Sequence, residues 1–136
     1  MAGPGRAAES IGRSAEFLVE TPERFLELPR PEPDKRLLDD PDVRDLFLKT
    51  ILQAVQQGID AYAWDGVLER RAWGFSLAGI AANVWIFHGE QDAAVPPSDA
   101  EQLAAALSGS HVKLVADAGH GLIITYWAEI LSALNR

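Results

Sequence analysis

Two stretches of the sequence place an acid and a histidine where proton-transfer chemistry needs them. Asp92 follows the apolar run of IFHGEQD, and His120 follows a second apolar run in ADAGH. An aspartate that accepts the Nδ1 proton of an imidazole fixes the tautomer of the ring and leaves Nε2 free to take a proton from a nucleophile. Asp92 and His120 are therefore a candidate acid and base pair.

The elements around the two residues predict how they meet. Short apolar runs at residues 83–88 and 112–116 alternate with helical patterns at residues 98–107 and 121–134. This order predicts an α/β fold in which two parallel strands, about 4.8 Å apart, are joined by a right-handed crossover. Both strands then end at the same edge of the sheet, where catalytic groups of open α/β sheets gather.

The first half of the chain predicts helices separated by prolines. Residues 1–73 carry 24 charged side chains and residues 74–136 only 8, which indicates two regions with different burial. Thr21-Pro22 and Asp40-Pro41 each fit an N-cap followed by proline at the first helical position. The helices expected here cover residues 7–19, residues 41–58 with a glycine at the end, and residues 60–70, with a connector at residues 28–34. In the second region, SDAE at residues 98–101 fits a capping box.

The stretch VWIFHGEQDAAVPPSDAEQLAAAL, followed by HVKLVADAGHGLI, resembles the carboxyl-terminal part of an α/β-hydrolase of the esterase and lipase type. In that superfamily a strand ends in glycine, the triad acid follows after two residues, and a valine–proline comes soon after. The matching residues here are Gly89, Asp92, Val95 and Pro96, with Gly119-His120 as the histidine loop. The resemblance implies that Asp92 is the triad acid and His120 the triad base of an enzyme that hydrolyses an ester or related acyl bond. It implies no diffusible cofactor.

The resemblance extends upstream to a helical cap, which many α/β-hydrolases insert before the acid-bearing strand. It implies a partial α/β-hydrolase fold, with a cap at residues 1–73 and the carboxyl-terminal part of the core at residues 74–136. Because cap helices commonly cover the acyl pocket, four aromatic residues are candidates for contact with substrate: Tyr62, Trp64, Trp73 and Phe75. The alternative for all four is ordinary packing between cap and core.

The sequence departs from the family at the nucleophile, which a complete member carries in a G-x-S-x-G turn between strand and helix. The similar stretch around Ser76, GFSLA, has alanine at the second glycine and follows charged residues where a buried strand belongs. We therefore expect the nucleophile outside these residues, and the chain to be a fragment, truncated product or split half that is inactive alone. An aspartate nucleophile, as in dehalogenases and epoxide hydrolases of the same fold, stays open.

Other polar residues near the pair have simpler interpretations. His88, in a His-Gly pair at the end of a strand, is expected to be structural, and His111, at the start of a strand, to face solvent. Glu90 is expected to support the site or to be solvated. Asp117 lies three residues before His120 and is an alternative acid, although the loop geometry favours Asp92.

Composition excludes several classes of function. The net charge of −8 disfavours nucleic acid and anionic membrane surfaces, because phosphate binding needs clustered Lys and Arg. Without cysteine and with only three scattered histidines, the chain has no disulfide framework and no metal-ligand cluster. No export signal or membrane span is recognisable, so a cytoplasmic location is expected.

The predicted sheet is too small to be stable alone. Two strands bury little apolar surface, and the run at residues 83–88 is apolar on both faces, as in an interior strand with an open hydrogen-bonding edge. We expect this edge to pair with a missing amino-terminal half or a second copy, or the chain to be marginally folded. The alternative to a hydrolase is a noncatalytic binding module whose partner covers the exposed apolar surface.

Overall fold

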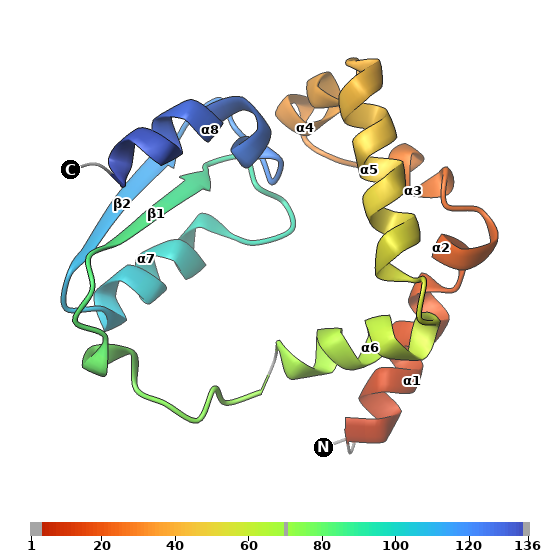
Figure 1. Cartoon of the computed structure of the whole chain (residues 1–136), viewed down its shortest axis with the longest axis horizontal. Helices are drawn as coiled ribbons and strands as arrows, with labels where there is room; N and C mark the ends of the chain where they lie inside the picture. Colours follow the sequence, from red (N-terminus) through yellow and green to blue (C-terminus); the bar gives the residue numbers. More distant parts are fainter. Residues whose placement is uncertain (1–3, 70, 135–136) are drawn as a thin grey trace. The chain divides into compact units, whose positions relative to one another are not determined.

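The computed structural model describes residues 4–69 and 71–134, which form two compact units (Figure 1). Unit 1 takes the described residues up to Pro29 and from Leu38 to Trp73, and unit 2 takes residues 30–37 and those from Gly74 onward. The boundary between Trp73 and Gly74 therefore coincides with the division that the sequence suggested. Residues 30–37, expected in the first region, belong instead with the carboxyl-terminal part. The roles of cap and core stay predictions.

The described residues of unit 1 form helices and the turns between them, with no strand. Their bounds are α1 Pro4–Ala15, α2 Phe17–Glu20, α3 Arg24–Glu27, α5 Pro41–Ala54 and α6 Ile59–Leu68. The N-cap of α5 is confirmed, because Asp40 Oδ1 accepts a hydrogen bond from Asp42 N at 2.9 Å. Around Ala15, Leu18 and Val55 lies a cluster of buried apolar side chains. These helices bury their apolar faces against one another within the unit.

Thr21 does not cap a following helix, so that prediction is wrong. Its backbone N–H donates to Phe17 O at 2.8 Å, which makes it the C-cap of α2. The helix that follows begins only at Arg24, because residues 22–23 form a turn. A threonine before a proline fits the end of one helix as well as the beginning of the next, and here Thr21 ends the preceding helix, α2.

Unit 2 contains a two-stranded sheet among the described residues, with helices on both faces (Figure 1). Its elements are α4 Glu32–Leu37, a 3₁₀ turn η1 Leu77–Gly79, β1 Val84–Gly89, α7 Pro97–Ala106, β2 Ser110–Val115 and α8 Leu122–Ala133. The strands pair in parallel, from Val84 opposite Ser110 to Gly89 opposite Val115. The predicted order of strand, helix, strand and helix, and the α/β fold class, are confirmed.

Two local predictions in unit 2 need correction. The N-cap of α7 is Pro96, and Ser98 lies inside the first turn, so the capping box is not formed. The connector predicted at residues 28–34 ends earlier than expected, because α4 begins at Glu32. Pro33 is accommodated in the first turn of α4, where a proline removes no intrahelical hydrogen bond.

The interior of unit 2 is small. Its buried apolar residues, among those described, are Pro33, Ala100, Leu107, Val115, Ala118 and Ala133. In β1 only Gly89 is buried, and the other five residues are half-buried. No helix of the described residues is long and apolar enough to cross a membrane.

Candidate active site

Hydrogen bonds tie together the two loops that leave the carboxyl ends of β1 and β2. Glu90 N donates to Val115 O at 2.9 Å, and Gln91 N donates to Ala118 O at 3.0 Å. The Gln91 side chain adds a third bond, from Nε2 to Ala116 O at 2.9 Å. These bonds fix the loop that carries Asp92 against the loop that leads to His120.

Gly89, the last residue of β1, is required by this close approach. A Cβ atom at this position would lie 2.4 Å from Ala118 O and 2.5 Å from Gly119 O, which no side chain tolerates. The glycine that ends the first apolar run therefore has a steric cause: it lets the two loops touch.

The structure brings Asp92 and His120 into contact. His120 Nδ1 lies 2.9 Å from Asp92 Oδ2, in the geometry of a hydrogen bond. The Asp92 side chain is 5% exposed, whereas the His120 side chain is 62% exposed. A buried carboxylate thus holds one ring nitrogen of an exposed imidazole, and Nε2 is the nitrogen that Asp92 does not engage. This arrangement suits an orienting acid and a proton-transferring base.

The second oxygen of Asp92 is held by its own loop. Asp92 Oδ1 accepts hydrogen bonds from Ala94 N at 2.8 Å and from Val95 N at 2.9 Å. Burial raises the pKa of Asp92, but the bonds from Val95, His120 and Ala94 and the charge of His120 outweigh it, so the pKa lies below its ordinary value. Asp92 is therefore ionised at neutral pH and acts as an acceptor only.

His88 supports this loop. Its Nε2 lies 3.0 Å from Val95 O and 3.8 Å from Asp92 Oδ2, and its side chain is largely buried. Since Nε2 bonds a carbonyl oxygen, the ring donates from that atom. The contacts agree with a structural role. His111 is exposed and stacks on Trp85 across the strands, with ring centroids 4.4 Å apart.

Neither Asp117, the alternative acid, nor Glu90 takes part in the hydrogen bond between Asp92 and His120. Asp117 is exposed and lines a cavity, and the side-chain bond of His120 goes to Asp92. Glu90 is exposed and contributes its backbone N–H to the bond with Val115. Ser76 precedes η1, and residues 71–76 form no strand, so the strand, turn and helix of a nucleophile elbow are not formed around it.

The four aromatic candidates for substrate contact divide between the units. Tyr62 packs against the buried cluster within unit 1. Trp64 and Trp73 are exposed residues of unit 1, and Phe75 is an exposed residue of unit 2. Contact of these residues with a substrate stays a prediction.

A residue that the sequence did not single out also contacts the histidine loop. Asp34 of α4 accepts hydrogen bonds from His120 N at 3.0 Å and from Gly121 N at 2.8 Å. Asp34 lies 86 residues before His120, in a proline-rich segment expected to be a connector, so no local pattern links the two. The three alternating prolines before it, Pro29, Pro31 and Pro33, predicted a connector and not a helix that packs on the histidine loop.

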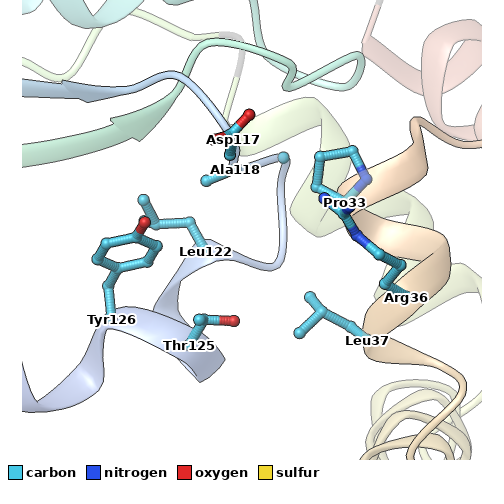
Figure 2. Close-up of a pocket in the computed structure, with 9 residues that line it drawn as sticks. Pro33, Arg36, Leu37, Asp117, Ala118, Leu122, Thr125 and Tyr126 are labelled. Carbon is cyan, nitrogen blue, oxygen red and sulfur yellow. The ribbon is translucent and has the colours of Figure 1, made fainter.

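A cavity of about 200 Å³ lies beside this contact, within unit 2. Figure 2 shows Pro33, Arg36 and Leu37 of α4 on one side and Leu122, Thr125 and Tyr126 of α8 on the other. Asp117, Ala118 and Gly119 close it from the histidine loop. Among the described residues, no group of three or more acidic or histidine side chains is placed to hold a metal ion.

The comparisons with known proteins bear on the fold. No protein-family model matches the chain, and no curated protein matches it. Among solved structures, the chain is similar to the esterase EaEST from Exiguobacterium antarcticum, with 18% identity and a TM-score of 0.57. The match covers 96% of this chain and 45% of the esterase. The chain thus has an esterase-like α/β fold that spans less than half of the length of that enzyme.

Proposed function

We propose that the chain carries the acid and base of a hydrolase of the α/β-hydrolase superfamily, acting on an ester or related acyl bond. The observation that carries the proposal is the 2.9 Å contact between His120 Nδ1 and the buried carboxylate of Asp92, at the carboxyl edge of a parallel sheet. The esterase-like fold supports the same assignment.

In the proposed reaction, His120 moves the proton. With Nδ1 held by Asp92, Nε2 takes the proton of a hydroxyl nucleophile as that oxygen attacks the carbonyl carbon. His120 then returns the proton to the leaving alcohol, and a water molecule repeats the sequence to release the acid. Asp92 stays ionised throughout and stabilises the imidazolium that forms.

The nucleophile is proposed to come from residues beyond these 136. None of the serines in the described part of the chain occupies a tight turn between a strand and a helix. The substrate, an ester-like small molecule, and the pairing with an amino-terminal half belong to the same proposal. Substrate contacts from Tyr62, Trp64, Trp73 and Phe75, with unit 1 as a cap and unit 2 as core, complete it.

The test is hydrolysis of a short p-nitrophenyl ester by the purified chain, with three variants. Where the chain hydrolyses the ester, alone or complemented by the missing half, turnover should fall by about 10²–10⁴-fold in His120→Ala, because a general base contributes that much. The matched control is His111→Ala, which removes an exposed histidine that stacks on Trp85 and should leave the rate unchanged.

Each outcome of this assay assigns the chemistry. Turnover that survives His120→Ala contradicts the proposal. Turnover that is lost in Ser76→Ala would make Ser76 the nucleophile, against the sequence interpretation. A wild-type rate equal to that of buffer agrees with a nucleophile from another polypeptide, and the same variants are then compared in the complemented enzyme.

A noncatalytic binding module is the second candidate, and one observation favours it. Ile123, Trp127 and Leu131 recur at four-residue spacing on α8 and are exposed, so they form an apolar stripe along one face of the helix. A partner protein with an apolar surface would cover this stripe. Isolation of the chain with such a partner, with no ester hydrolysis by the complex, would favour the module over the enzyme.

A further inference from the structure

The backbone that carries His120 is held from the side by α4. Asp34 uses each carboxylate oxygen once: Oδ2 accepts from His120 N and Oδ1 from Gly121 N. These donors lie at the beginning of α8, whose N-cap is Gly121, where backbone N–H groups have no partner in the helix. A negative charge is also favourable at this end of the helix dipole.

The glycines on both sides of His120 fit this contact. A Cβ atom on Gly119 would lie 2.3 Å from Asp34 Oδ2, and one on Gly121 would lie 2.4 Å from Leu37 Cδ1. Neither glycine has a positive φ, because Gly58 and Gly74 alone have one among the described residues. The Gly-His-Gly sequence therefore fits the close approach of the Asp34 and Leu37 side chains, and no positive φ requires it.

Two bonds to consecutive N–H groups restrain the loop more than one bond would. The peptide groups on both sides of the His120 Cα are fixed, so the loop cannot turn the imidazole away from the β1 loop. Asp92 is fixed independently, by Ala94 N and Val95 N. The 2.9 Å contact between the two side chains thus joins two loops that are anchored separately.

We propose that Asp34 is a positioning residue for His120: it holds the histidine loop where Nδ1 meets Asp92. The proposal rests on the proposed function only in calling the Asp92–His120 pair catalytic. The positional part is independent of any activity, because it concerns the hydrogen bond between the two side chains. A carboxylate is required because it has an acceptor oxygen for each of the two backbone N–H groups. The side chain of asparagine has one acceptor oxygen, and its NH₂ group would face the second N–H donor.

The test is the tautomer of His120, read from long-range ¹H–¹⁵N spectra of the full chain. The spectra are recorded over a series of pH values, and the tautomers are compared on the alkaline plateau, where the His120 signals no longer change with pH. In the wild type the Nδ1–H tautomer should dominate, because Asp92 accepts that proton. Asp92→Ala defines the spectrum of a ring without this acceptor.

Asp34→Asn and Asp34→Ala should both shift the His120 spectrum toward that of Asp92→Ala, the alanine variant further than the asparagine variant. The matched control is Asp39→Asn, which removes an exposed carboxylate five residues away and should leave the spectrum unchanged. A general loss of stability does not change a tautomer in the folded protein. Folded Asp34→Ala with the wild-type tautomer would overturn the proposal.

Gly119→Ala tests the same contact from the other side. It keeps the carboxylate but displaces it from the loop, so it should give the same spectral shift even where Asp34→Ala does not fold. Combined with Asp34→Asn it should add little, because both changes break one contact. A wild-type tautomer in Gly119→Ala counts against the proposal.

In an assembly that hydrolyses esters through His120, Asp34→Asn should lower kcat by about tenfold and leave KM unchanged, as expected when an interaction is lost in the transition state only. A wild-type tautomer in folded Asp34→Ala overturns the positioning role, whereas turnover that survives His120→Ala overturns the proposed function. The two failures are thus distinguishable.

Discussion

The residue that defines the site is Asp92, a buried anion with three donors. Its pKa is lowered, because the bonds from Val95, His120 and Ala94 outweigh the effect of burial. A carboxyl group whose pKa is lower in the folded state stabilises the fold above its unfolded pKa, about 3.9 for aspartate, and this contribution is lost as pH falls through the folded value.

Asp92→Asn should therefore destabilise the chain at neutral pH, by about 1–3 kcal/mol for disturbed buried hydrogen bonds. The difference in unfolding free energy between wild type and variant should be present at neutral pH and at pH 5 and shrink below about pH 4. Urea unfolding at a series of pH values measures it, with the exposed Asp39→Asn as control. A difference that persists unchanged to pH 2 would contradict the assignment.

At the scale of elements, the site depends on two loops and one short helix. Local pattern predicted the strands, α7, α8 and the Asp92–His120 pair, because apolar runs that end in glycine are features of sequence neighbours. The same reasoning failed at Thr21 and Ser98, where two adjacent elements compete for one polar residue. It could not predict the contact of Asp34 with the histidine loop, because a contact between residues 86 positions apart does not affect the local periodicity of the sequence.

The close contact between the loops that follow β1 and β2 predicts a large loss of stability for Gly89→Ala. Its new methyl group would meet Ala118 O at 2.4 Å, so the loops must separate, at a cost of about 1–3 kcal/mol or more for overpacking. Gly79→Ala is the matched control: it meets nothing within 4 Å and has no positive φ, so it should change stability by less than about 0.5 kcal/mol. Equal urea midpoints for the two variants would refute the steric account.

At the scale of the whole molecule, unit 2 has less covered surface than a stable sheet requires. No third strand of the described residues pairs with β1, and large side chains such as Val112 and Trp127 are exposed. Val84 N and Glu90 N donate to the β2 side, so by alternation the N–H groups of Trp85 and Phe87 lie on the open edge. An open edge of this kind is a template for another strand.

We therefore expect the chain to associate through β1 or to be marginally stable. Size exclusion with light scattering should show species above the 14.8 kDa monomer, and Phe87→Pro should reduce them, because it removes a donor from the open edge only. Ile86→Pro is the contrast, since it removes a donor to β2 and should unfold the sheet. A strictly monomeric wild type that unfolds sharply above about 60 °C would refute the expectation.

Residues 30–37 interrupt unit 1 in sequence but belong to unit 2, and this has a consequence in time. A ribosome adds roughly 5–20 residues per second. Asp34 is made 86 residues before His120, so it waits for its partner for about 4–17 seconds. During that interval the helices of unit 1 can form on either side of an α4 that has nothing to bind. The Asp92–His120 pair can thus form only after unit 1 and both strands of unit 2 have been synthesised.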